Sequence, residues 1–161
     1  AAAMLNAPGA TSTPPTMTES RFMLEPGDPE VWGLDSASLI LSEDEVRIII
    51  CGSHGQALAG SPENALKRNV LGAVFHDAGI GIDDAGVNRL PILDQRGIPT
   101  ATVAAESARI GDARSIYDDG ILSKVNLTAA NMGAEVGFST KGFVSAIKAS
   151  LKSTAPYKMT H

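Results

Sequence analysis

Three short apolar runs, each followed by a turn that contains glycine, constrain the fold of this chain most strongly. They cover residues 47–51, 72–75 and 100–104. Continuous apolar runs of this length are typical of strands that are buried on both faces, as in a parallel sheet. Segments with helix-start and helix-stop signals separate the runs. The sequence therefore predicts a single three-layer, Rossmann-like α/β domain with a mostly parallel sheet of four or five strands.

Four helices and one further strand are expected around these runs. The helices are predicted over residues 61–68, 83–95, 115–131 and 139–148, and the further strand, at a sheet edge, over residues 35–41. Ser61 precedes a proline at the first helical position, which is an N-cap pattern. Asp83 or Asp84 is expected to cap the second helix, which Gly97 ends. Pro91 lies inside that second stretch, so the helix is either kinked or starts late.

The N-terminal fifth of the chain differs in composition from the remainder. We predict a flexible or extended arm over residues 1–33, the α/β domain over 34–153 and a tail over 154–161. Residues 22–32 are apolar but contain two prolines, which should exclude them from a helix and from a central strand. An apolar arm needs a surface to cover it, so we expect a homo-oligomer, most simply a dimer, with Trp32 at or near the interface. The alternative is that the arm folds back on its own domain.

Charge and composition limit the classes of partner. The chain has 161 residues, of which 43% are hydrophobic and 19% charged, a composition typical of a globular domain. Its formal net charge is −5, and the basic residues are scattered, which argues against a nucleic-acid partner. No apolar run is long enough for a membrane-spanning helix. A small-molecule ligand is therefore the expected partner.

The single cysteine, Cys51, bears on the expected cellular compartment of the protein. One cysteine makes no internal disulfide, so the fold does not depend on oxidation, and a reducing cytoplasm is the expected location. The N-terminal residues also lack the charged-then-apolar order of a secretory signal. Cys51 follows three isoleucines, a position that favours a small buried hydrophobic residue over a nucleophile.

The polar turns after the three strands are the expected functional site. They are residues 51–55, 76–86 and 106–112. The carboxyl ends of parallel strands share one edge of a sheet, and open α/β sheets bind ligands at that edge, where the strand order reverses. We therefore expect these turns to converge, although they are far apart in the sequence.

The first turn is expected to bind a ligand through Gly52, Ser53 and Gly55. Glycines allow a close backbone approach, and successive amides can hold an anionic oxygen. His54 is a candidate for proton transfer. The spacing matches neither a phosphate-binding loop nor a dinucleotide fingerprint, so no cofactor is expected. The alternative is a tight turn in which the serine is only a cap.

The second turn supplies two further candidate catalytic residues, His76 and Asp77, which end a buried strand. A histidine and a carboxylate are the usual partners in acid–base catalysis. A metal site would combine a histidine with Asp77 and an acid at position 83 or 84. The spacing of these residues is not that of known metal sites, so no metal is expected.

The third turn offers Ser107, Arg109 and Asp112 as ligand-binding residues. An arginine after a strand end suits bidentate recognition of a carboxylate, and Asp112 would orient it. The alternative interpretation is a surface ion pair between Arg109 and Asp112. Tyr117, Asp118 and Asp119, farther along the expected helix, are predicted to be solvated.

These residue types favour an enzyme that acts on a small polar, anionic metabolite by acid–base chemistry without a cofactor. His54 or His76 would carry the proton. Asp77 would orient the reacting groups or abstract a proton, and Arg109 would hold the anion. The alternative is a non-catalytic ligand-binding or regulatory subunit that uses the same turns. Turnover that depends on the histidine and the aspartate separates the two hypotheses.

Overall fold

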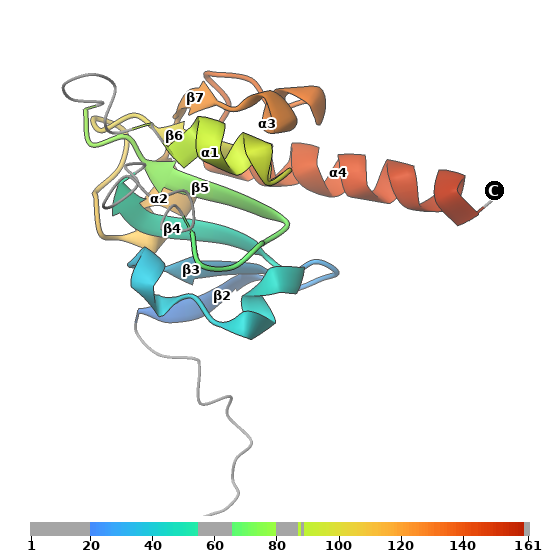
Figure 1. Cartoon of the computed structure of the whole chain (residues 1–161). Coiled ribbons are helices and arrows are strands. Elements are labelled where there is room, and N and C mark those ends of the chain that lie inside the picture. Colours follow the sequence, from blue (N-terminus) through green and yellow to red (C-terminus); the bar gives the residue numbers. More distant parts are fainter. Residues whose placement is uncertain (1–19, 55–65, 80–86, 88, 160–161) are drawn as a thin grey trace, which may run out of the picture.

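The chain folds around a six-stranded sheet with the strand order β2-β3-β4-β5-β6-β7 (Figure 1). In this computed structural model, residues 20–54, 66–79, 87 and 89–159 are described. The strands are β2 (Arg21–Glu25), β3 (Val31–Leu34), β4 (Ile48–His54), β5 (Gly72–His76), β6 (Thr100–Val103) and β7 (Leu122–Val125). The three apolar runs in the sequence form β4, β5 and β6, as predicted.

The sheet is mixed. Strands β3 to β6 are parallel, whereas β2 pairs with β3 and β7 pairs with β6 in the antiparallel direction. The α/β class is therefore confirmed, but the prediction of a mostly parallel sheet of four or five strands is wrong. The antiparallel strands β2 and β7 are short and contain polar residues, Arg21 and Glu25 in β2 and Ser123 and Lys124 in β7, so they lack the continuous apolar run on which the prediction relied.

Short helices cover the sheet, and the last helix is long. The 3-10 helices are η1 (Ala37–Leu39) and η2 (Ser42–Val46), and the α-helices are α1 (Arg89–Gln95), α2 (Ala113–Asp119), α3 (Leu127–Asn131) and α4 (Thr140–Met159). The strand expected over residues 35–41 is wrong, because η1 occupies that segment. The helix expected over 61–68 lies mostly outside the described residues, and residues 66–68 are not helical. Asp83 and Asp84 also lie outside them, whereas Gly97 ends α1 with φ = +72°, as predicted.

The helix expected over residues 115–131 is wrong, because that stretch forms α2, β7 and α3. Gly120 ends α2, and the following residues pair with β6. Asn126, which is buried, then holds the chain in its turn: its side-chain oxygen accepts hydrogen bonds from Thr100 N and Ala129 N, and its Nδ2 donates to Ile98 O at 2.9 Å. These partners come from different elements, so helical spacing alone did not reveal the break.

The parallel strands follow one another across the sheet without reversing direction, because β3, β4, β5 and β6 are successive neighbours. Right-handed crossovers between such strands place every connection on the same face. Buried residues from the three connections, including Ile40, Leu66 and Leu93, accordingly belong to one apolar cluster. No reversal of strand order occurs between β3 and β6, so a crevice at a reversal point does not define the site.

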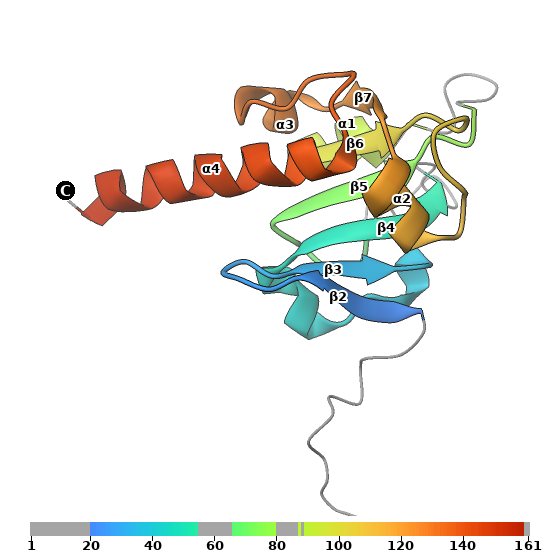
Figure 2. The ribbon, with the colours of Figure 1, turned by 180° about the vertical axis from the view of Figure 1, so that it is seen from behind.

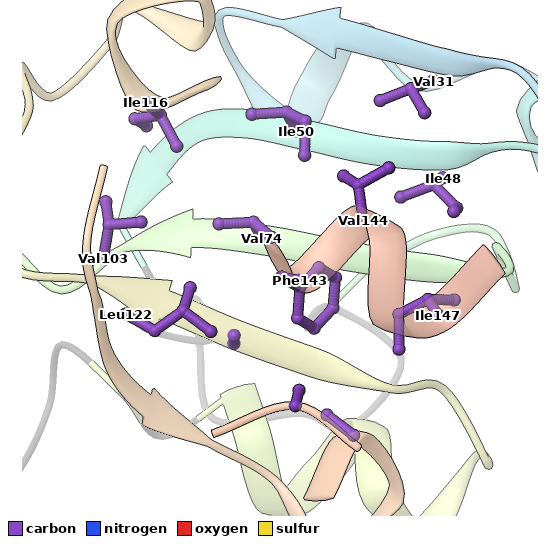
Figure 3. Packing of buried hydrophobic residues seen from close by; sticks show 13 residues of the cluster. Val31, Ile48, Ile50, Val74, Val103, Ile116, Leu122, Phe143, Val144 and Ile147 are labelled. Atoms are coloured by element: carbon purple, nitrogen blue, oxygen red, sulfur yellow. The ribbon is translucent and has the colours of Figure 1, made fainter. Parts of the chain in front are cut away.

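Two apolar clusters bury the two faces of the sheet. On one face, Phe143, Val144 and Ile147 of α4 pack over Ile48 and Val74 of the central strands (Figure 3). On the other face, the second cluster lies under α1 and η1. Figure 2 shows α2 and α4 on the face opposite α1. The Rossmann-like three-layer arrangement itself stays a prediction.

The N-terminal hairpin of β2 and β3 belongs to the sheet, which begins before the predicted domain boundary at residue 34. The expectation that residues 22–32 stay out of a central strand is wrong, because β3 pairs on both sides and begins only after Pro29. Trp32 is 4% exposed and packs against the guanidinium groups of Arg21 and Arg47, at 5.1 and 4.2 Å from the ring centre. The prediction of a homo-oligomer is not tested by these contacts.

A buried ion pair connects β2 to η2. Arg21 Nη1 lies 2.6 Å from Asp44 Oδ2, and the exposed fractions of the two side chains are 5% and 0%. Asp44 also accepts hydrogen bonds from Arg47 Nη1 and from the backbone N–H of Leu41. Burial alone would raise the pKa of Asp44, but these hydrogen bonds outweigh it and hold the pKa below its ordinary value.

A second polar contact connects the hairpin to the helices. Glu25 accepts a hydrogen bond from Tyr117 Oη of α2 at 2.5 Å and one from Lys148 Nζ of α4 at 2.8 Å. Burial and the adjacent Glu25 carboxylate raise the pKa of Tyr117. The prediction that Tyr117 is merely solvated is therefore wrong, because it fixes β2 to α2.

Helix α4 begins where predicted and runs farther than predicted. The hydroxyl of Ser139 accepts the N–H of Gly142 at 3.0 Å, so it caps the first turn. The helix continues to Met159, into the predicted tail, and its C-terminal half extends past the sheet (Figure 1). None of the described helices has the length and apolar character needed to cross a membrane.

We expect Asp44→Asn to lower the free energy of unfolding by about 3 kcal/mol at neutral pH, because it breaks a buried ion pair. Since the folded-state pKa of Asp44 lies below the unfolded value of about 3.9, its contribution is complete above that value and is lost as the pH falls further. The difference between wild type and variant should therefore shrink towards pH 3. Urea unfolding from about pH 7 to 3 measures this. Glu45→Gln, which breaks only an exposed pair with Arg68, is the control and should cost at most about 0.5 kcal/mol.

Candidate functional site

The ends of β4 and β5 meet the loop after β6 at one edge of the sheet. Residues 55 and 80–86, which complete the first two predicted turns, lie outside the described residues. The backbone N–H of Gly111 donates to Gly52 O at 2.8 Å, which joins the loop after β6 to the end of β4. His76 Nε2 lies 2.8 Å from Ala108 O, which joins the end of β5 to the same loop. Residues far apart in the sequence are therefore held together by backbone contacts as well as by the sheet.

Gly52 is needed for the contact between these segments. A Cβ atom at this position would lie 2.4 Å from the carbonyl oxygen of Asp35 and 2.8 Å from the carbonyl carbon of Gly111. The close backbone approach that glycine allows is therefore made by the protein's own loops. The proposal that Gly52 binds a ligand is not supported by this contact, which gives the residue a structural role.

Ser53, the next residue of the first turn, contacts η1. Ser53 Oγ accepts the backbone N–H of Ala37 at 2.8 Å, so it supports η1. This is the capping role named as the alternative interpretation. His54 ends β4, where its backbone pairs with His76, while its side chain lies outside the described atoms. Gly55 lies outside the described residues.

Both ring nitrogens of His76 face backbone partners. Nδ1 accepts the N–H of Ala78 at 2.9 Å, so in the neutral ring the proton is on Nε2, which donates to the carbonyl of Ala108. The side chain is 3% exposed. A proton carrier needs one nitrogen available to the substrate, so this arrangement favours a positioning role for His76 over catalysis.

Asp77 begins a tight turn at the end of β5. Its Oδ1 accepts the N–H of Gly79 at 2.7 Å, and its backbone N–H donates to Val103 O. The turn places Ala78 at φ = +53° and Gly79 at φ = +79°. The left-handed conformation is unfavourable for alanine by about 1 kcal/mol. The turn thus holds a buried carboxylate at the loop edge at a cost in backbone strain.

The third turn uses most of its polar groups to hold its own shape. Ser107 Oγ donates to Ala104 O and accepts the N–H of Ile121, which links the loop to the start of β7. Asp112 caps α2, since its Oδ1 accepts the N–H of Ser115 at 2.9 Å. That hydrogen bond and the nearby arginine hold the pKa of Asp112 below its ordinary value.

Arg109 is the candidate with the most available side chain. It is 82% exposed, and its Nε and Nη2 approach one oxygen of Asp112 at 3.4 and 3.3 Å. This is the surface ion pair named as the alternative interpretation. Exposed pairs of this kind contribute at most about 1 kcal/mol, so a ligand carboxylate can compete for the guanidinium.

An open pocket of about 300 Å³ lies between this loop and α2. Its lining residues are Ala105, Glu106, Ser107, Ala108, Arg109, Ser115 and Asp119. Two of the predicted ligand-binding residues, Ser107 and Arg109, therefore line one pocket. Neither Gly52 nor Asp112 lines it.

Two carboxylates of the pocket, Glu106 and Asp119, were not among the predicted ligand-binding residues, and Asp119 was expected only to be solvated. Both are exposed, and neither makes a hydrogen bond or ion pair with the part of the chain that the structure describes. Asp119 follows Ser115 by four residues, a helical spacing that puts both on the side of α2 that lines the pocket. That spacing was available in the sequence, but it needed the correct helix bounds to be useful.

Two other possibilities raised by the sequence are limited by the structure. Cys51 is fully buried, and burial raises the pKa of its thiol, which disfavours the reactive thiolate. Among the described residues, no three His, Cys, Asp or Glu side chains gather closely enough to hold a metal ion. The acids at positions 83 and 84 lie outside that description.

Comparison of this chain with protein-family models, with curated proteins and with solved structures found no significant match.

We expect Gly52→Ala to destabilise the protein by at least about 3 kcal/mol, because its Cβ would overlap backbone atoms that have no room to move. Gly72→Ala is the matched control, since its Cβ would meet no atom closer than 3.6 Å. The control should change the free energy of unfolding by at most about 1 kcal/mol. Thermal unfolding and hydrogen exchange of the Gly111 amide measure the effect. Equal stability of the two variants would contradict the assigned role of Gly52.

We expect nitrogen NMR of the full chain to find His76 in the tautomer with its proton on Nε2, because Nδ1 accepts a backbone hydrogen bond. His76→Ala should cost about 1–3 kcal/mol, since the Ala78 N–H and the Ala108 carbonyl lose their partner. A ring whose proton is on Nδ1 would overturn this assignment and make His76 available again as a proton carrier.

Proposed function

We propose that this protein binds a small polar molecule that carries a carboxylate, in the pocket between the loop 105–109 and α2. The observation that carries this proposal is the pocket of about 300 Å³ with the exposed guanidinium of Arg109 at its lining. Small-molecule sites have volumes from about 300 Å³ upwards and use a few charged groups for orientation. The pocket therefore fits a small metabolite.

Arg109 is suited to release its present partner when a ligand arrives. Only one oxygen of Asp112 faces the guanidinium, and both distances exceed 3.2 Å. Asp112 keeps its hydrogen bond to the Ser115 N–H when Arg109 turns away, so the N-cap of α2 survives the exchange. A ligand carboxylate that approaches the guanidinium with both oxygens makes stronger, bidentate contacts.

The rigid loop lowers the entropic cost of binding. Ser107 and Ser115 use their hydroxyl groups within the protein, Ser107 on Ile121 N–H and Ser115 on the backbone N–H of Arg109. These bonds fix the loop beside α2 before any ligand is present. Pre-organised sites lose less conformational freedom on binding, so the same contacts yield a higher affinity.

A second candidate function is an acid–base enzyme that acts on the same ligand. The strained turn at Ala78 favours it, because backbone strain beside a buried carboxylate is more common at functional sites. His54 and Asp77 would then exchange protons with the substrate, and His76 would position the loop. The alternative is a non-catalytic ligand-binding or regulatory subunit.

The proposal includes the cellular compartment, the layer arrangement and the oligomeric state of the protein. A reducing cytoplasm is supported by the single cysteine, which is buried and unbridged. A Rossmann-like three-layer arrangement is supported by the apolar clusters on the two faces of the sheet. A homo-oligomer is also proposed, supported by exposed apolar side chains such as Val46 and Leu127, at 70% and 74%.

We expect Arg109→Ala to weaken the binding of small carboxylates about tenfold or more, because a charge-assisted hydrogen-bonded pair is lost. Arg114→Ala is the matched control. Arg114 is an exposed residue of α2 that packs on the ring of Phe22 and does not line the pocket. Calorimetric titration of both variants with a panel of small carboxylates measures this. Equal affinities in the two variants would exclude Arg109 as the anion-binding group.

Turnover distinguishes the enzyme hypothesis from the hypothesis of a non-catalytic binding subunit. His54→Ala and Asp77→Asn should abolish conversion of a bound carboxylate while its affinity changes by less than about threefold, if these groups act on the reacting atoms. Product detection by mass spectrometry over a panel of bound ligands measures conversion. Binding without conversion in the wild-type chain assigns the non-catalytic function.

A further inference from the structure

We infer that the ligand of this pocket carries an ammonium group as well as a carboxylate, as an α-amino acid does. This inference depends on the proposed function, because it names the ligand class of the same pocket. It also departs from the purely anionic ligand that the sequence favours. The balance of charges around the pocket favours such a ligand.

Carboxylates outnumber cationic groups in the lining. Glu106 and Asp119 are both negative, whereas Arg109 is the one cation among the described residues that line the pocket. Arg109 is also partly neutralised by Asp112 at 3.3 Å. A ligand with only negative charge would meet repulsion from the two carboxylates as it approached the guanidinium. A ligand with one charge of each sign meets a complementary partner for both.

The two carboxylates are available to a ligand. Neither makes a hydrogen bond or an ion pair with the residues that the structure describes, and both are exposed. Asp118, the neighbour of Asp119, instead lies 3.7 Å from Lys141 Nζ and does not line the pocket. The acids of this helix therefore divide into one that faces a lysine and one that faces the pocket.

The other polar groups of the pocket do not explain recognition. The hydroxyl of Ser107 already donates to Ala104 O, and that of Ser115 accepts the N–H of Arg109. Discrimination between ligands therefore falls to Arg109, Glu106 and Asp119. An ammonium group supplies three donors to carboxylate acceptors, whereas a hydroxyl or phosphate supplies fewer donors or more negative charge.

The experiment compares free proteinogenic L-α-amino acids with their 2-hydroxy-acid counterparts, in which a hydroxyl replaces the ammonium group. Each compound is titrated into the ¹⁵N-labelled full chain, and amide shifts of residues 105–109 and 115–119 report binding. We expect at least one amino acid to bind, and its 2-hydroxy acid to bind about tenfold or more weakly. Glu106→Gln and Asp119→Asn should each weaken the binding of the amino acid about two- to fivefold, and the double variant should weaken it more. Neither should weaken the 2-hydroxy acid.

Asp118→Asn is the matched control and should leave the affinity unchanged. Equal binding of amino acids and 2-hydroxy acids would overturn this inference and leave the proposed function in place. An equal gain in affinity for the amino acid and for the 2-hydroxy acid in Glu106→Gln would also overturn it. Failure of every compound to shift these amides would overturn the inference and the proposed function together.

Discussion

The approach of the loop after β6 to Gly52 is the contact on which the candidate site depends. The Gly111 N–H reaches Gly52 O at 2.8 Å only because no Cβ occupies the space beside the Asp35 carbonyl. The same loop then passes over His76 and forms one wall of the pocket. A side chain at position 52 would overlap Gly111 and the Asp35 carbonyl, so this loop could not keep its place. The glycine therefore supports the pocket without lining it.

The central strands were predictable because their signal is local. Residues 48–50 are three consecutive isoleucines, all of them fully buried. The edge strands were not predictable, because distant partners stabilise them. Arg21 of β2 finds its carboxylate at Asp44, and Glu25 finds Tyr117 across most of the chain. Local patterns of apolar residues contain no record of such contacts, so the hairpin appeared as an arm.

The convergence of the strand ends was predictable, whereas the roles of the side chains there were not. Parallel strands bring their carboxyl ends together whatever the loops contain, so the convergence followed from topology. The roles depend on which backbone groups need partners within the loops. Polar side chains such as Ser53 and His76 satisfy those groups, because buried backbone atoms without partners are costly. A sequence lists the side chains but not these requirements.

This division separates the groups that shape the edge of the sheet from the groups that remain for a ligand. Hydroxyl and imidazole groups, which donate and accept over short distances, are used to fix one loop to the next. The long or charged side chains of Arg109, Glu106 and Asp119 extend from that fixed backbone into solvent. A fixed backbone that carries exposed charges favours recognition by charge pattern over recognition by tight enclosure. Because the pocket is open and its lining is charged, the spacing of positive and negative groups on the ligand, more than its shape, should determine what binds.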